Sequence, residues 1–443
     1  MTPYTSSPFP VPPIPHLSPS TSARSKSHYS HLNCSPFPLQ PHCFPSLFLI
    51  HPTPFPIPFI HPFPHSSLHI PITLVLITFC PPYPPSSSSE ELALPFTVPL
   101  HLPSRLFTLR LPARHGARGY RAALCTQLAQ PLLVQDLPAP RLQPCQVRVR
   151  VHYCGLNFAD ILACQGLYQE KRTPPFTPGM EFSGTVMETG ENVSAVKEGH
   201  RVIGVSGVSA MAEECIVNEK ALWQIPDNMS SEDAAVLPVA YGTAWLALHH
   251  RAHLQPQETV LVTAGAGATG LAIIDLAVSV FQAKVIAAAG SDPKCQLVLA
   301  NGASHAVNYS QNSLREQVTA LTGGRGVNVA IEAVGGDIFK AALQSLAWEG
   351  RIVVMGFAGG KIPSIPANLL LLKNVSAMGV YWGRYQQEDF PLFSSAMSSL
   401  LQYCQEGKIH PQIGAVFKLE EVNEAFNHVL QRKSTGKVII SMK

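Results

Sequence analysis

Three glycines with the spacing Gly-x-Gly-x-x-Gly, namely Gly265, Gly267 and Gly270, follow an apolar run and precede a stretch with helical spacing of apolar residues. Glycines in such a turn let the backbone approach a pyrophosphate, and the N-terminus of the next helix offers unpaired N–H groups to the anion. A dinucleotide held in this way supports redox chemistry. Because glycine turns also arise for packing reasons, the motif has weight only between a strand and a helix.

The sequence around the glycines provides this context. Residues 260–262 predict a buried strand, residues 271–281 a helix, and residues 284–289 a second strand, which together make a βαβ unit. Further apolar strands alternate with helical patterns, at 306–308, 327–331, 352–355 and 375–382. This alternation predicts a doubly wound parallel sheet, so we expect an α/β protein.

A different pattern precedes this sheet. Residues 147–153 alternate apolar and polar side chains, as a half-buried strand does, and glycine-punctuated β-rich stretches follow at 181–190 and 199–204. These stretches predict a small irregular barrel over about residues 120–241. We expect a helix at 422–432 and a strand at 437–441 that return to this first domain.

The front of the chain has an unusual composition. Its first hundred residues hold 24 of the 41 prolines, and Glu90 and Glu91 are the only acids before Asp136. Proline fixes φ and removes backbone donors, so we expect residues 1–118 to be a disordered head. The apolar run 70–80 is shorter than the ~20 residues that a bilayer span needs, so no membrane span is expected.

Charge and cysteine usage limit the compartment and the partners. The net charge is only +3, which does not indicate a nucleic-acid-binding face. The ten cysteines form no Cys-x-x-Cys pair, which favours a reducing compartment. The arginine-rich, acid-free segment 105–121 resembles the end of a mitochondrial transit peptide and is otherwise a linker. The expected localisation is therefore mitochondrial or, failing that, cytoplasmic.

Four motifs match one family: Cys-Gly-Leu-Asn-Phe-Ala-Asp at 154–160, Gly-Leu-Tyr at 166–168, Pro-Gly-Met-Glu-Phe-Ser-Gly at 178–184 and Val-Ala-Tyr-Gly-Thr-Ala-Trp at 239–245. From Tyr120 onward the chain resembles the zinc-free, zeta-crystallin-like quinone oxidoreductases of the medium-chain dehydrogenase/reductase family. The resemblance implies a GroES-like catalytic domain over 119–241 and 383–443, and a Rossmann domain over 242–382. It also implies a homodimer that pairs through the edge strand 377–382.

The residues at the metal position favour a reaction without zinc. Zinc-dependent members of the family place a cysteine where Asn157 stands and a histidine where Met180 stands. An amide and a thioether are poor substitutes for a thiolate and an imidazole, so no metal is expected. Without a Lewis acid, the natural task of bound reduced nicotinamide is hydride delivery to an electron-poor quinone or enone.

The end of the second strand of the βαβ unit indicates which nicotinamide is bound. No acid ends this strand, and Gly290, Ser291 and Lys294 leave room and donors for the extra phosphate of NADP(H). The alternative is NAD, with Asp292 as the ribose ligand. The predicted cofactor contacts are Ala264, Gly265, Gly267, Ala268, Thr269, Gly270, Gly290, Ser291 and Lys294, and the resemblance adds Tyr309 and Lys433.

The resemblance also implies the residues at the reacting end, Asn157, Tyr168 and Tyr241. We expect Asn157 to stabilise developing negative charge and Tyr168 to pass a proton from water. Asp160 and Glu181 are interpreted as structural residues that orient loops.

The expected function is NADPH-dependent reduction of quinones or α,β-unsaturated carbonyls by hydride or electron transfer. Cys164 and Leu162 replace an arginine and a tyrosine of familiar quinone reductases, so the substrate preference of those enzymes is not carried over. One alternative is a 2-enoyl thioester reductase, which needs a tyrosine acid and an apolar channel. Another is a catalytically silent, crystallin-like protein that binds NADPH or RNA.

Overall fold

The computed structural model describes residues 118–443. The predicted disordered head, apart from Arg118, and the part of the arginine-rich segment before that residue lie outside the described residues. Within 118–443, no helix is both long and apolar enough to cross a membrane.

The second half of the chain forms a six-stranded parallel sheet. Its strands are, in spatial order, β10 (His305–Asn308), β9 (Lys284–Ala289), β8 (Thr259–Val262), β11 (Val327–Glu332), β12 (Leu346–Val354) and β13 (Ser376–Gly379). The first strand in the chain lies at the centre and the third and sixth lie at the two edges, which is the doubly wound order. The predicted parallel sheet is therefore confirmed.

Helices connect these strands as the apolar pattern predicts. They are α4 (Ala268–Ser279), α5 (Asp292–Ala300), α6 (Leu314–Leu321), α7 (Gly336–Gln344) and α8 (Ala367–Lys373). The predicted strand 375–382 is shorter than expected, because β13 ends at Gly379 and α9 (Trp382–Glu388) begins soon after, followed by α10 (Phe390–Gln405). β13 is an edge strand, and its pairing with a second copy stays a prediction.

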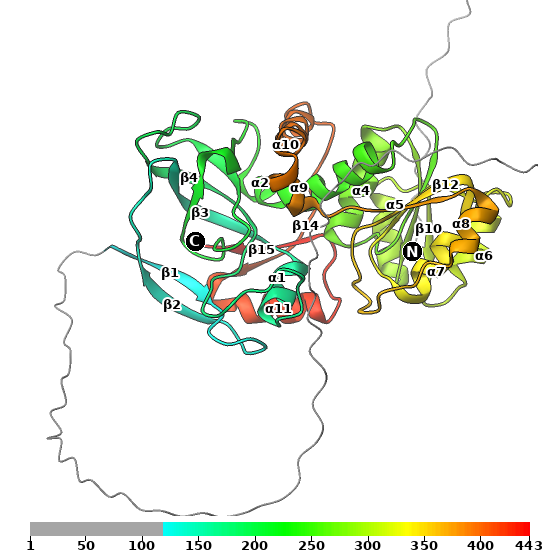
Figure 1. Cartoon of the computed structure of the whole chain (residues 1–443), viewed down its shortest axis with the longest axis horizontal. Helices are drawn as coiled ribbons and strands as arrows, with labels where there is room; N and C mark the ends of the chain where they lie inside the picture. Colours follow the sequence, from blue (N-terminus) through cyan, green and yellow to red (C-terminus); the bar gives the residue numbers. More distant parts are fainter. Residues whose placement is uncertain (1–117) are drawn as a thin grey trace, which may run out of the picture. The chain divides into compact units, whose positions relative to one another are not determined.

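The first half of the chain builds a mainly antiparallel sheet, called the first sheet below, beside the hairpin β1 (Gly119–Leu124) and β2 (Leu133–Pro138), and the parallel sheet is called the second sheet. The strand order of the first sheet is β14 (Ile413–Lys418), β15 (Lys437–Ser441), β3 (Gln146–Leu156), β4 (Glu181–Thr189), β5 (Arg201–Val205) and β7 (Leu222–Gln224), with β6 (Glu214–Asn218) paired to β3. The C-terminal strand β15, drawn in red in Figure 1, pairs antiparallel with β3. The expected return of the tail, with α11 (Val422–Leu430), is thus confirmed.

A helical segment connects the two sheets. It runs from α2 (Ser231–Val236) through a wide π-helical turn (Leu237–Tyr241) and α3 (Gly242–Trp245) into a second wide turn that ends at Arg251. Its first wide turn contains Pro238, which has no N–H to give. The next N–H, that of Val239, donates to Glu181 Oε2 over 2.7 Å. The irregular turn thus supplies a backbone donor to the first residue of β4.

Asn157 is the N-cap of helix α1 (Phe158–Cys164), and a buried carboxylate fixes the start of this helix. Asp160 Oδ2 accepts the Asn157 N–H at 2.9 Å, and Asp160 Oδ1 accepts the Gly179 N–H at 3.0 Å. Asp160 is 1% exposed, and this burial raises its pKa to about 7, although the two backbone N–H groups act in the opposite direction. One carboxylate therefore anchors both the start of α1 and the loop before β4.

Asp160 should make the stability of the fold depend on pH. Because its pKa is raised on folding, the folded chain keeps a proton that the unfolded chain releases, so stability falls as pH rises from about 4 through about 7. The loss amounts to roughly 4 kcal/mol at most. Urea unfolding across this range should show Asp160→Asn gaining stability relative to the unmodified chain as pH rises. The exposed Asp337→Asn is the control, and a difference that does not change with pH would contradict the assignment.

Candidate active site

Asn157 makes hydrogen bonds with a buried ion pair, whose two residues lie on two strands of the first sheet. Lys437, the first residue of β15, places Nζ 2.5 Å from Oε1 of Glu181, the first residue of β4. The side chains of Lys437 and Glu181 are 1% and 0% exposed. Lys437 Nζ also donates to Asn157 Oδ1 over 2.7 Å, so the amide, the ammonium and the carboxylate form one network.

The hydrogen bonds of Asn157 decide what its side chain can offer a ligand. Its Nδ2 donates to Glu181 Oε1 at 2.8 Å and to the Gly155 carbonyl at 3.2 Å, which uses both amide hydrogens. Stabilising negative charge, the role expected for Asn157, requires a free hydrogen. The structure instead leaves one acceptor position on Oδ1, because the neighbouring ammonium and carboxylate fix the orientation of the amide.

Tyr168 lies in the loop after α1 and is half-buried. Its hydroxyl donates to the hydroxyl of Tyr381 over 3.2 Å. Burial raises the pKa of Tyr168, and the charge of Asp160 acts in the same direction. Tyr168 therefore lies near Asp160, and its hydroxyl hydrogen is engaged by Tyr381, in the turn between β13 and α9.

Tyr241 has a different surrounding. Its side chain is 2% exposed, and its hydroxyl donates to Asp275 Oδ2 on α4 over 2.7 Å. Burial and Asp275 raise its pKa well above the ordinary value. The structure does not bring the Tyr241 hydroxyl to Asn157 or Tyr168, and this hydroxyl ties the connecting helix to α4.

Asp160 and Glu181 orient backbone, as the sequence interpretation expected, through the Asn157, Gly179 and Val239 N–H groups. Lys437, the partner of Glu181, was not predicted from the sequence. A lysine at the start of an apolar strand is typical of a solvated strand end, so only the pairing of β15 with β3 reveals its burial.

The glycine turn has the backbone that phosphate binding needs. Ala264 has a left-handed φ of 49°, so the chain turns at this residue, directly before Gly265. A Cβ on Gly270 would lie 2.4 Å from the Ala264 carbonyl oxygen and 2.6 Å from that of Gly265. Gly267 precedes α4, whose first turn holds Ala268 and Thr269. The turn therefore presents a 12-residue helix N-terminus without a blocking side chain, which fits a dinucleotide pyrophosphate.

Most of the residues predicted to select NADP(H) gather where β9 ends. A Cβ on Gly290 would lie 3.4 Å from the hydroxyl of Tyr309, and Lys294 Nζ donates to the carbonyl of Arg432 over 2.7 Å. Burial raises the pKa of Tyr309 and lowers that of Lys294, and the nearby Arg432 charge lowers both. Ser291 does not use its hydroxyl to cap α5. The group thus combines two cations, a phenol and a hydroxyl.

Three more residues lie near this group. Lys433 is exposed, and its role as a cofactor contact stays a prediction. The adjacent Arg432, which was not predicted from the sequence, lowers the pKa of Tyr309 and of Lys294 through its charge. The carboxylate of Asp292 accepts from Asn308 at 2.7 Å and Gln311 at 3.2 Å, and these hydrogen bonds lower its pKa.

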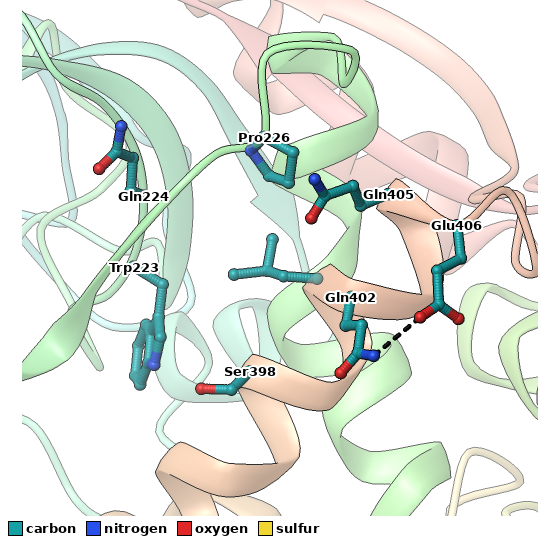
Figure 2. A pocket seen from close by; sticks show the side chains of 8 residues that line it. Trp223, Gln224, Pro226, Ser398, Gln402, Gln405 and Glu406 are labelled. Carbon is teal, nitrogen blue, oxygen red and sulfur yellow. Dashed lines mark hydrogen bonds between the residues drawn. The ribbon is translucent and has the colours of Figure 1, made fainter.

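A cavity of about 740 Å³ lies away from these residues, between β7 and α10. Figure 2 shows Trp223 and Pro226 on one side and Gln402 and Glu406 on the other, with the hydrogen bond of 2.7 Å that joins the last two. Lys408 pairs with the same Glu406 carboxylate at 2.7 Å. Ser398 also donates to the carbonyl of Ser394, and none of the predicted site residues lines this cavity.

Comparison with known proteins agrees with this geometry. The family model of the alcohol dehydrogenase GroES-like domain matches residues 143–227, and a model described as zinc-binding dehydrogenase matches residues 268–399. The chain is 67% identical over 326 residues to quinone oxidoreductase-like protein 2 of Mus musculus, which covers 74% of this chain and 93% of the mouse protein. The Bos taurus protein of the same name is 65% identical over 340 residues, covering 77% and 97%.

Among solved structures, the quinone oxidoreductase of Thermus thermophilus, described also in its complex with NADPH, is 34% identical. Its TM-score is 0.64, with 73% of this chain and 100% of that chain covered. The predicted α/β fold, with a GroES-like domain and a Rossmann-type parallel sheet, is confirmed. The chain therefore belongs to the medium-chain dehydrogenase/reductase family of oxidoreductases, in its group of quinone oxidoreductase-like proteins.

Proposed function

We propose that this chain is an NADPH-dependent, zinc-independent reductase of quinones or other α,β-unsaturated carbonyl compounds. The observation that carries the proposal is the buried network of Lys437, Glu181 and Asn157, at the position where zinc-dependent relatives are expected to hold a metal ligand. The glycine turn supplies the place for the cofactor.

The residues at this position do not fit zinc. The oxygen of Asn157 is bound by the ammonium of Lys437, whose charge repels a divalent cation, and Glu181 is already paired with that ammonium. The nearby thiol of Cys154 is buried, and burial together with Asp160 raises its pKa well above the ordinary value, so a thiolate is disfavoured. Within residues 118–443, no group of three or more His, Cys, Asp or Glu side chains could hold a metal ion.

The cofactor residues fit NADPH. Lys294, Arg432, Tyr309 and Ser291 surround the end of β9 with donors suited to a phosphate, while Asp292 is held by Asn308. When bound, the reduced nicotinamide supplies a hydride to an electron-poor acceptor. The chain holds the phosphates at the glycine turn, and the free acceptor position of Asn157 can orient a donor group of a ligand.

Steady-state assays of the full chain with NADPH and a panel of acceptors test this function. The panel contains ortho-quinones, enones and 2-enoyl thioesters, and turnover of either of the first two classes is expected. Turnover of thioesters alone would reassign the chain as an enoyl thioester reductase. Tight NADPH binding without turnover of any acceptor would make it a binding protein, and titration with RNA would then follow.

Lys294→Ala should weaken NADPH binding by about 10- to 100-fold and leave NADH binding nearly unchanged, because a charge-assisted contact to the extra phosphate is lost. Fluorescence titration of both cofactors measures this. Lys197→Ala is the matched control, since this exposed lysine belongs to the other half of the chain and its ammonium has no hydrogen-bond or ion-pair partner among residues 118–443. Equal losses for the two cofactors would contradict NADP selectivity at this group.

Asn157→Ala should lower kcat by about 10- to 100-fold while the Kd for NADPH changes by less than about threefold, because orientation at the reacting end is lost and the phosphate contacts remain. Asn423→Ala is the matched control. The side chain of Asn423 makes two hydrogen bonds, both of 2.9 Å and both to Leu132, so Asn423→Ala should lose stability without losing kcat. Parallel losses of kcat and NADPH affinity in Asn157→Ala would count against its role.

A further inference from the structure

Two consecutive hydrogen bonds connect the hydroxyl of Tyr168, through Tyr381, to the carboxylate of Glu170 at the surface. The Tyr168 hydroxyl donates to the hydroxyl of Tyr381 over 3.2 Å, and that hydroxyl donates to Glu170 Oε1 over 2.7 Å. Tyr381 is 40% exposed and the side chain of Glu170 is 46% exposed. The two hydrogen bonds point in the same direction, from the half-buried phenol toward a carboxylate in contact with water.

The geometry of the two phenols is fixed by packing. Their rings meet edge to face, with centroids 6.5 Å apart and an interplanar angle of 71°. Tyr381 directly precedes α9, whose first residue, Trp382, is 7% exposed. A Cβ on Gly242 would lie 2.3 Å from Trp382 Nε1, so the indole packs directly on the connecting helix. Tyr381 is therefore held by the packing of Trp382 on the connecting helix, while Tyr168 and Glu170 belong to the loop after α1.

Few charged groups among residues 118–443 lie near these three side chains. Arg172 lies 3.6 Å from Glu170 Oε2, and the Asp160 and Glu170 charges act on Tyr168 together with that of Arg172. Burial raises the pKa of Tyr381, and its hydrogen bonds with Tyr168 and Glu170 raise it further. Both phenols therefore stay protonated at neutral pH, and each carries the hydrogen that a relay needs.

We propose that Tyr168, Tyr381 and Glu170 form a proton relay to the oxygen of the substrate, with Glu170 as its solvent end. When Glu170 is protonated, its carboxyl proton passes to the Tyr381 oxygen, the Tyr381 proton passes to the Tyr168 oxygen, and the Tyr168 proton passes to the substrate oxygen. The substrate carbon receives the hydride from the reduced nicotinamide cofactor, and water then returns a proton to Glu170. Each phenol loses one O–H bond and gains another, so both end the cycle unchanged.

The protonation state of Glu170 sets the direction of the relay. With Glu170 ionised, both phenols donate outward, as the structure shows, and the relay can only take a proton from the side of Tyr168. With Glu170 protonated, both hydrogen bonds reverse and Tyr168 becomes a donor. This relay rests on the proposed reductase function, and it supplies the donor that Asn157, with both amide hydrogens engaged, does not.

The test compares Glu170→Gln, Tyr381→Phe and the unmodified full chain over a range of pH, with the acceptor that the unmodified chain reduces best. Glu170→Gln keeps an oxygen for the Tyr381 hydroxyl but cannot carry a proton inward. We expect it to lower kcat by about 10-fold or more and to remove one ionisation from the pH profile, with KM little changed. Tyr381→Phe, which removes the middle of the relay, should give the same profile.

A second readout needs no turnover. Absorbance titration of phenolate in the chain without acceptor should show one tyrosine, missing in Tyr381→Phe, that ionises at lower pH in Glu170→Gln, because the carboxylate no longer opposes a second negative charge. Glu191→Gln, at an exposed acid, is the matched control and should change neither readout.

The outcomes separate the two proposals. If the unmodified chain reduces no acceptor, the reductase function fails and the relay with it. If it reduces one and Glu170→Gln keeps the unmodified pH profile while Tyr381→Phe loses activity, the contact only holds the two sheets together and the relay alone is wrong.

Discussion

The candidate site depends on the ion pair between Lys437 and Glu181. Both side chains are almost completely buried, and withdrawing such ions from water costs several kcal/mol per ion, so further partners must complete the pair. The amide of Asn157 and the N–H of Val239 supply them. Because removal of any partner would leave a buried charge less satisfied, β4, β15, the start of α1 and the connecting helix are held in one arrangement.

The residue before β15 connects this network to the glycine turn. Gly436, immediately before Lys437, forms a bridge with Gly267, and its N–H donates to the carbonyl of Ala266 over 3.0 Å. Gly436 has a φ of 82°, and a Cβ there would lie 2.8 Å from the Gln412 carbonyl oxygen, so only glycine fits without strain. Two consecutive residues thus contact the glycine turn and Asn157, which fixes the separation between them.

The sequence predicted what depends on local pattern. Alternation of apolar strands and helices revealed the parallel sheet, and short motifs revealed Asn157 and the glycine turn. The residues it missed act through partners far along the chain: Lys437 contacts Asn157 across 280 positions, Arg432 contacts Lys294 across 138, and Tyr381 contacts Tyr168 across 213. The local spacing of residues in the sequence does not indicate such distant pairs. For the same reason it could not show that the hydroxyl of Tyr241 is engaged by Asp275.

The position of β15 also has a consequence for the order in which the protein is built. This strand lies between β14 and β3, inside the first sheet, yet it follows the whole parallel sheet in the sequence. During synthesis, β3 can therefore pair with β15 only after the whole parallel sheet has been made. Contacts of such long sequence separation slow folding. The parallel sheet, whose strands are contiguous in the chain, can form first and serve as the surface on which the antiparallel half is completed.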